Sequence, residues 1–292
     1  MILDAHVHIK TGPVEQARFL RELRACGVDG AVMTSLRPLC FKVIGNTAPP
    51  KERLAHLLEW TKDAPTLFPF YYMDPTEPTA VRQVEMAVKA GVAGFKIICT
   101  HFHPGDRRAM RAYRAIAEAG KPLLFHSGIL WDGKPSSKFN RPAEWEAMLE
   151  VPKLRFALAH ISWPWVDECI AVYGKFQSAY SKRSDVSCEM FIDLTPGTPR
   201  IYREEALRKI FTIGYDVAKN VLFGTDGTTK WYPPDWAPYW IRRDNEIYDI
   251  LAVDKATRRN VFHENLLRFL GRSGIEATPR AKTTPRPRRS SS

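Results

Sequence analysis

Short apolar runs alternate with stretches of helical periodicity along most of the chain, and this alternation limits the fold more than any other feature of the sequence. Apolar residues recur at helical spacing in segments such as 14–25, 80–90 and 107–119. The apolar runs between the helical segments have the length of strands. We expect eight strands, over residues 2–8, 28–35, 67–73, 93–99, 122–126, 154–160, 186–194 and 221–226. Strands that alternate with helices predict a parallel sheet with helices packed on it.

The number of these units indicates a closed barrel. Eight strand–helix units within residues 1–271 fit a single-domain α/β fold, the (β/α)8 or TIM barrel, which typically takes ~250 residues. Gly27, Gly91 and Gly120 each stand between a helix and the next strand, where a left-handed residue commonly closes a helix. Two further helical stretches, the second over 254–270, should complete the outer layer. An open doubly wound sheet is the alternative, but the sequence lacks a G-x-G-x-x-G after the first strand and a G-x-x-x-x-G-K-[ST] anywhere.

Much of the basic charge lies at the C-terminal end of the chain. The formal net charge is +11, and residues 272–292 contribute +5 of it through six basic residues and Glu276. This segment is rich in Pro, Thr and Ser and holds too few apolar residues to offset the entropy cost of ordering. We expect a disordered basic tail. A nucleic-acid partner is not expected, because no aromatic side chains are interleaved with the charges.

Composition points to the reducing cytoplasm. No apolar stretch approaches the ~18 residues that a membrane-spanning helix needs, and the first residues lack the basic and apolar regions of a signal peptide. We therefore expect neither membrane insertion nor secretion. The five cysteines are an odd number, widely scattered and without a C-x-x-C pair, which argues against a disulfide framework and a cysteine zinc site. The sequence predicts a cytoplasmic protein.

Polar residues end four of the expected apolar strands. His6 and His8 close the first strand, and His126, His160 and Asp226 close the fifth, sixth and eighth. Side chains alternate along a strand, so His6 and His8 should both face the barrel interior, where two imidazoles at this spacing can hold one metal ion. Barrel enzymes keep their active sites at the C-terminal ends of the strands, and buried unpaired imidazoles are costly. The pattern predicts a metal-dependent active site at that end.

This arrangement of residues resembles the amidohydrolase superfamily. The resemblance is carried by D-x-H-x-H at residues 4–8, by the histidines after the fifth and sixth strands and by G-[ST]-D at 224–226, and it covers the whole barrel. The segments AGFK at 93–96, LAH at 158–160 and VLFGTD at 221–226 are similar to one subgroup. That subgroup includes aminocarboxymuconate-semialdehyde decarboxylase, related aromatic-acid decarboxylases, and several lactonases and hydrolases.

The resemblance implies a metal site and roles for its residues. The implied ligands of one divalent ion are His6, His8, His126 and Asp226. We expect zinc, with manganese as the alternative, because imidazole and carboxylate ligands with an open position suit a catalytic zinc, which lowers the pKa of its water toward ~7. Asp226 would take the proton of the attacking water and pass it to the leaving group. His160 would lie beside the ion and stabilise the developing oxyanion.

Lys96 bears on whether the site holds one metal ion or two. In the binuclear branch of the superfamily, a carboxylated lysine on the fourth strand bridges two ions, and Lys96 stands at about that position. In a mononuclear site its ammonium group could instead hold a substrate carboxylate. We expect one ion, with two as the alternative.

The loops around the expected site indicate the kind of substrate. A second H-x-H, His101 and His103, follows the fourth strand and could bind the substrate or a second metal ion, or could simply be part of an ordered loop. Aromatic and basic residues gather after strands five, six and eight: Trp131, Trp163, Trp165, Trp231, Tyr232 and Trp236, with Lys134, Lys138, Arg141 and Lys230. Aromatic walls with cations between them fit a planar or ring-shaped substrate that carries a carboxylate.

Three functions follow from the sequence. The first is a hydrolase that opens a small, carboxylate-bearing lactone, amide or ring substrate by means of a metal-activated water. The second is a decarboxylase of an aromatic or enol carboxylic acid, which would need the same ligands. The third is a non-catalytic binding protein that uses the basic tail, although a complete set of ligands argues against it. We expect a small-molecule substrate as the partner and leave the formation of a homo-oligomer open.

Overall fold

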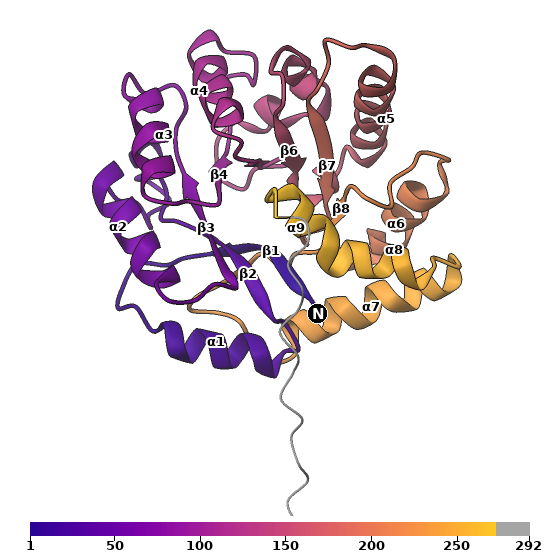
Figure 1. Ribbon diagram of the computed structural model, residues 1–292. Helices are drawn as coiled ribbons and strands as arrows, with labels where there is room; N and C mark the ends of the chain where they lie inside the picture. Colours follow the sequence, from indigo (N-terminus) through magenta and orange to yellow (C-terminus); the bar gives the residue numbers. More distant parts are fainter. Residues whose placement is uncertain (273–292) are drawn as a thin grey trace, which may run out of the picture.

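Strands and helices alternate along residues 1–272, which are the residues that this computed structural model describes, and the strands form a ring inside the helices (Figure 1). The strands are β1 (Leu3–His8), β2 (Gly30–Thr34), β3 (Leu67–Tyr72), β4 (Gly94–Ile97), β5 (Leu123–Phe125), β6 (Arg155–Leu158), β7 (Glu189–Asp193), β8 (Val221–Leu222) and β9 (Gly227–Thr228). The α-helices are α1 (Gln16–Ala25), α2 (Pro50–Thr61), α3 (Ala80–Lys89), α4 (Arg107–Glu118), α5 (Val166–Lys182), α6 (Arg203–Thr212), α7 (Trp236–Ile250), α8 (Lys255–Arg259) and α9 (Asn265–Phe269). From residue 273 on, the predicted basic tail lies outside the described residues.

The strands close into a barrel. Each strand pairs in parallel with its neighbours in the order β8-β7-β6-β5-β4-β3-β2-β1-β9. β8 and β9 stand where the sequence predicted one eighth strand over 221–226, and the chain between them leaves the ladder. The ring still closes on both sides of this break, because the Ala5 amide donates to the Phe223 carbonyl at 2.9 Å and β9 pairs with β1. The predicted (β/α)8 barrel is confirmed, with its eighth strand divided.

Alternate strand positions fill the interior of the barrel. Leu3, Val32, Phe70, Leu124 and Phe191 belong to one buried cluster inside the ring. The positions next to them along the strands pack into the larger buried cluster between the strands and the helices. This separation is the two-residue period of a strand applied to a closed sheet.

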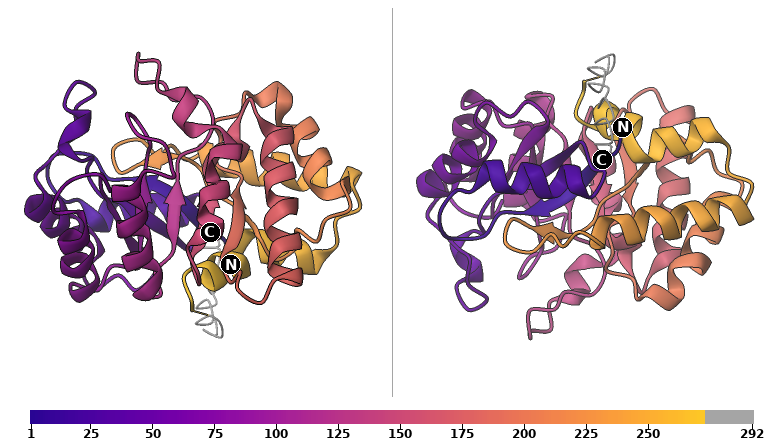
Figure 2. Two further views of the ribbon diagram at one scale, coloured as in Figure 1. Left: turned by 90° about the horizontal axis from the view of Figure 1, so that it is seen from above. Right: turned by 90° about the horizontal axis from the view of Figure 1, so that it is seen from below.

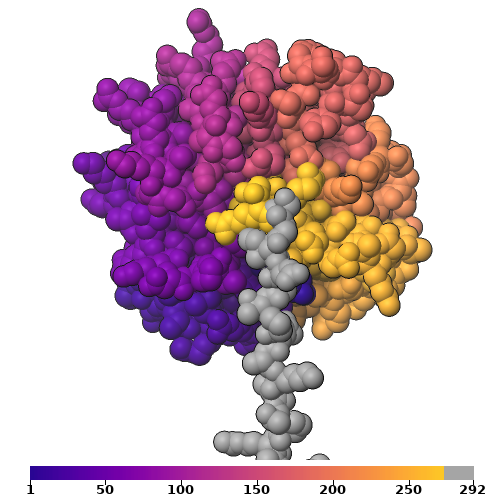
Figure 3. All heavy atoms as spheres, in the orientation of Figure 1, coloured from indigo at the N-terminus to yellow at the C-terminus, as the bar shows by residue number. Residues whose placement is uncertain are grey.

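The last helical segment closes one end of the barrel. It divides into α8, a π-helical turn (Asn260–Glu264) and α9. Leu266, Leu267 and Phe269 join the interior cluster, and the Phe269 ring lies 5.0 Å from that of Phe191. This segment, in yellow, lies at the same end as the N-terminus in Figure 2 and fills the centre of that end in Figure 3. The prediction that 254–270 completes the outer layer is therefore wrong for α9, whose apolar side chains cover the N-terminal end of the interior. Val261 and Phe262, before α9, do pack in the cluster between the strands and the helices.

The helices that lead into β2, β4 and β5 end as the sequence predicts. Gly27, Gly91 and Gly120 have φ angles of 74°, 87° and 67°, the left-handed region in which glycine avoids the clash that a Cβ would cause. Within residues 1–272, none of the helices combines the length and the hydropathy that crossing a membrane requires.

Candidate active site

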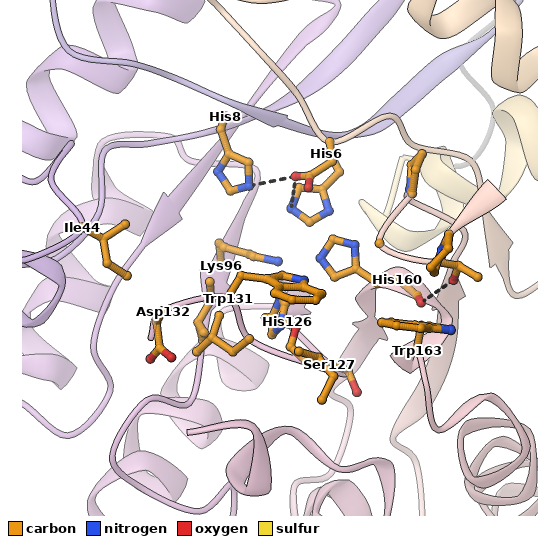
Figure 4. A pocket seen from close by; sticks show the side chains of 18 of the residues that line it. His6, His8, Ile44, Lys96, His126, Ser127, Trp131, Asp132, His160 and Trp163 are labelled. Carbon is orange, nitrogen blue, oxygen red and sulfur yellow. Dashed lines mark hydrogen bonds and ion pairs between the residues drawn. The ribbon is translucent and has the colours of Figure 1, made fainter. Parts of the chain in front are cut away.

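A cavity of about 520 Å³ opens at the C-terminal ends of the strands. Among the ionisable residues that line it, we call six the polar cluster: His6, His8, Lys96, His126, His160 and Asp226. Figure 4 shows the four imidazoles and the Lys96 amine directed toward one another. The structure thus brings together in one cavity every predicted metal ligand and catalytic residue, together with Lys96.

His6 and His8 reach the cavity from β1 through an irregularity in the strand. The pairing of β1 with β2 shifts by one residue between Asp4 and Val7, as in a β-bulge. Simple alternation would place Asp4 on the same face as both histidines. The bulge instead turns Asp4 outward, where it accepts a hydrogen bond from the Tyr232 hydroxyl at 3.0 Å, and leaves the two imidazoles facing inward.

The two ring nitrogens of His6 differ in their hydrogen bonding. Its Nδ1 lies 3.2 Å from the Oδ2 of Asp193, at the end of β7, and both side chains are buried. A carboxylate accepts hydrogen bonds, so the proton of a neutral His6 ring sits on Nδ1. The buried Nε2 has no hydrogen-bond partner among residues 1–272 and lies 3.9 Å from the Oδ1 of Asp226. His6 is thereby prepared to offer a lone pair at Nε2.

Asp226 lies opposite the histidine pair and depends on Asp4 for its position. It follows the break in the eighth strand with a φ of 56°. The preceding Thr225 is anchored to Asp4, whose Oδ1 accepts from the Thr225 amide at 3.0 Å and whose Oδ2 accepts from the Thr225 hydroxyl at 2.5 Å. This anchor directs the Asp226 carboxylate to the histidines, with Oδ1 at 3.3 Å from the Nε2 of His8.

The polar cluster contains a compact set of metal donors. One donor atom each from His6, His8 and Asp226 lies within 4.8 Å of the other two. Burial lowers the pKa of both His6 and His8, so their rings are neutral. Burial opposes ionisation of Asp226, but the hydrogen bond from His8 and the nearby imidazoles outweigh it and hold the pKa of that carboxyl well below its usual range. Neutral imidazoles and an ionised carboxylate are the forms that bind a divalent cation.

His126, the fourth predicted ligand, lines the same cavity outside this set of three. Its Nε2 lies 3.1 Å from the Ile129 carbonyl; because a carbonyl only accepts, Nε2 carries the proton and the lone pair is on Nδ1. Its ring lies 4.9 Å from that of His160. Burial and the neighbouring His160 lower the pKa of His126 well below its usual value.

His160 occupies a strained backbone segment. His160, Ile161 and Ser162 have φ angles of 64°, 49° and 55°, and three successive non-glycine residues in this region persist only where their surroundings hold them. The Ser162 hydroxyl accepts from Ser127 at 2.7 Å. Gly197 packs under the ring so closely that a Cβ at this position would lie 2.7 Å from the Cβ and Cγ of His160. Burial lowers the pKa of His160.

Lys96 is a buried amine in the middle of this group. Its side chain is buried, and its Nζ has no hydrogen-bond partner in the part of the chain that the structure describes. Burial lowers the pKa of Lys96 from 10.5 to about 8, although the carboxylates of Asp193 and Asp226 work in the opposite direction. A group with this pKa exchanges its proton close to neutral pH.

The second H-x-H lies outside the cavity. The Nδ1 of His103 lies 2.8 Å from Glu144, and the Nε2 of His101 lies 3.2 Å from the Thr76 hydroxyl. Neither side chain lines the cavity. Their placement gives no support to the predicted role in binding substrate or a second metal ion, and fits the simpler interpretation of an ordered loop.

The cavity walls agree only in part with the predicted substrate contacts. Trp131, Trp163 and Trp236 line the cavity as expected, together with Trp240. The cations on the walls, besides Lys96, are Arg37 and Arg200, and not the lysines and the arginine predicted from the loops after strands five and eight. Sequence reasoning also missed Asp193, although its place at the end of an apolar strand is the signal that identified the histidines.

Comparisons with known proteins give one family match and several similar solved structures. The amidohydrolase family model matches residues 4–272. Among solved structures, an uncharacterized TIM-barrel protein from Bordetella bronchiseptica has a TM-score of 0.67 at 17% identity, covering 94% of this chain and 99% of its own. A 2,6-dihydroxybenzoate decarboxylase from Rhizobium has a TM-score of 0.63 at 14% identity, with 92% and 98% covered. A zinc-bound amidohydrolase from Burkholderia multivorans has a TM-score of 0.61 at 10% identity, with 93% and 99% covered. Curated proteins give no match.

Proposed function

The chain belongs to the amidohydrolase family, and from this premise we propose that it is a metal-dependent hydrolase of a small, carboxylate-bearing lactone, amide or ring substrate. The observation that carries the proposal is the buried, unpartnered Nε2 of His6 beside the donors of His8 and Asp226. A buried polar atom without a partner is costly, and a divalent cation at this point would satisfy it.

The residues present fit a zinc ion. His6 Nε2, His8 and Asp226 would hold it, and the free Nδ1 of His126 makes that residue the fourth ligand. Zinc bound there supplies Lewis acidity and lowers the pKa of a water molecule. We propose a single ion, in which case the buried amine of Lys96 would serve a substrate carboxylate directly.

Asp226 and His160 would carry out the proton transfers and charge stabilisation. Asp226 is ionised across the neutral range, so its carboxylate can accept the proton of the attacking water and return it to the leaving group. His160 lines the cavity as a neutral imidazole that can donate a hydrogen bond to an oxyanion. Its strained backbone holds the ring at the cavity wall before the substrate arrives.

Arg37, Lys96 and Arg200 support a substrate with a carboxylate. Within residues 1–272 the Arg37 guanidinium donates a single hydrogen bond, at 3.4 Å to the Gly45 carbonyl, and Arg200 stacks over the Tyr239 ring at 4.2 Å. Neither guanidinium is paired with a carboxylate of the described residues, so both can pair with an anion in the cavity.

A decarboxylase remains the second candidate. The observation in its favour is the aromatic wall of Trp131, Trp163, Trp236 and Trp240, which suits the flat ring of an aromatic acid. Both reactions would use the same polar cluster, so the cluster does not distinguish them.

The test is a substrate panel of lactones, cyclic amides and aromatic carboxylic acids, applied to the zinc-loaded protein and to a His8→Ala control. Acid release on ring opening, dependent on His8, is the expected result. Release of carbon dioxide from an intact acid without ring opening would replace the hydrolase by the decarboxylase. A zinc-free protein that turns over the panel at the same rate would contradict both.

A further inference from the structure

Two large apolar side chains line the cavity where it meets solvent. Ile44, in the loop after β2, is 40% exposed, and Trp131, in the loop after β5, is 79% exposed, yet both belong to the cavity wall. Ile129 and Leu130 continue the apolar surface inward from Trp131. In Figure 4, Ile44 and Trp163 lie on opposite sides of the histidines. We call Ile44 and Trp131 the apolar entrance of the cavity; Asp132, next to Trp131 in the sequence, also lines the cavity.

The position of Ile44 is fixed by the base of its loop. The Arg37 amide donates to the Asn46 carbonyl at 2.9 Å, and the Ala48 amide donates to the Arg37 carbonyl at 3.2 Å. The Asn46 side chain also donates to the Ile9 carbonyl at 2.9 Å, just beyond β1. Residues 37–48 thus form a closed loop with Arg37 at its base and Ile44 near its tip, so one loop offers the cavity both a cation and an apolar side chain.

We propose that the substrate carries an apolar group, aromatic or branched aliphatic, in addition to its carboxylate, and that this group packs between Ile44 and Trp131. The inference rests on the proposed function, because it takes the polar cluster as the reacting end. Covering exposed apolar surface contributes to binding, and Ile44 and Trp131 are the most exposed of the large apolar side chains that line the cavity. A compact acid that reached only the polar cluster would leave both side chains in water.

Val43 makes it possible to distinguish a substrate at the entrance from a protein partner. It precedes Ile44 on the same loop and is 86% exposed, but it does not line the cavity. A second copy of the chain seated over the entrance would cover Val43 at least as well as Ile44. A substrate inside the cavity would contact Ile44 and Trp131 and leave Val43 untouched. Val43→Ser is therefore the matched control for Ile44→Ser.

The experiment is calorimetric titration of the zinc-loaded protein with two probes, benzoate and biphenyl-4-carboxylate. The second acid adds one phenyl ring to the first, and we expect it to bind about tenfold more tightly or better to the wild type. Ile44→Ser and Trp131→Ser should each remove most of that gain, and Ile44→Ser should leave the benzoate affinity unchanged. Val43→Ser should keep the gain. All three positions are exposed, so these variants should fold.

The remaining outcomes are distinguishable. Equal affinity of the wild type for the two acids would overturn this inference alone, since benzoate would still bind at the polar cluster. Failure of both acids to bind would overturn it together with the carboxylate specificity of the proposed function. A loss of the gain in Val43→Ser, or a dimer seen by sedimentation that Val43→Ser and Trp131→Ser dissociate, would overturn it in favour of a second copy of the chain.

Discussion

Asp193→Asn should weaken zinc binding about 10- to 100-fold while the barrel stays folded. Asp193 Oδ2 faces the Nδ1 of His6 at 3.2 Å, and its Oδ1 accepts hydrogen bonds from the Thr195 amide, at 2.7 Å, and from the Thr195 hydroxyl. Because Thr195 offers two donors, the oxygen of the new amide group would stay on that side. Its NH2 group would then face His6, and the His6 proton would move from Nδ1 to Nε2, the nitrogen that the metal ion needs.

The magnitude follows from the one bond that changes. A tenfold to hundredfold loss is about 1.4 to 2.7 kcal/mol, which agrees with the roughly 1.5–3 kcal/mol of a hydrogen bond to a charged group. Thr195→Val provides a graded comparison. It removes the hydroxyl donor to Asp193 but leaves the carboxylate facing His6, so zinc affinity should fall by less than about tenfold.

The assay is competition for zinc between the protein and a chromophoric chelator at fixed pH, with circular dichroism to verify the fold. Equal zinc affinity in the wild type and in Asp193→Asn would refute the argument that Asp193 sets the His6 tautomer. A loss in Thr195→Val as large as that in Asp193→Asn would also refute it, because packing at the end of β7 would then account for both.

Three further predictions concern the rest of the polar cluster. His160→Asn should keep one zinc per chain and lose roughly 10²–10³ in turnover; a fall in metal content by elemental analysis would instead make His160 a ligand. Gly197→Ala should also lower turnover at unchanged zinc content, because the new Cβ would displace the His160 ring from 2.7 Å contact; unchanged His160 ring signals in NMR spectra would contradict this. Lys96→Met should raise the stability of the metal-free protein at pH 7, because it removes a buried charge. Burial lowers the pKa of Lys96 from 10.5, its value in the unfolded chain, to about 8 in the folded protein. The unfolded chain binds the extra proton between those values, so wild-type stability should rise with pH from 8 to 10.5, and denaturant titrations of Lys96→Met should lack that rise.

The histidines of the site could be predicted because they end apolar strands. In a barrel all strand ends of one polarity meet at one rim, so His6, His126 and His160 could be brought together from sequence alone. Asp193 ends β7 in the same way. It was missed because β7 was expected to run on to Leu194, which put an apolar residue at the end of the strand and hid the carboxylate inside it.

The walls of the cavity could not be predicted in the same way. Ile44 takes its place from hydrogen bonds that close residues 37–48 into a loop, and those bonds join backbone groups that carry no pattern in the sequence. The lysines and the arginine expected at the site stand close to it along the chain, but their loops direct them elsewhere. The six aromatic residues were expected at the cavity because they follow strands five, six and eight in the sequence, and only three of them line it.

The bulge in β1 shows why contacts between residues distant in sequence decide the geometry of the polar cluster. The two-residue period assigns Asp4, His6 and His8 to one face, and nothing in D-A-H-V-H indicates the shift in register after Asp4. Asp4 is stabilised in its outward position by hydrogen bonds from Thr225 and Tyr232, 221 and 228 residues away. Burial raises the pKa of Asp4 to about 7, although the hydrogen bonds from these donors act in the opposite direction. The hydrogen bonds between Thr225 and Asp4 also hold Thr225 in place, and Thr225 positions the adjacent Asp226. The outward turn of Asp4 and the inward turn of Asp226 are thus one arrangement, and the family motif at residues 4–8 positions the carboxylate of the eighth strand as well as its own two histidines.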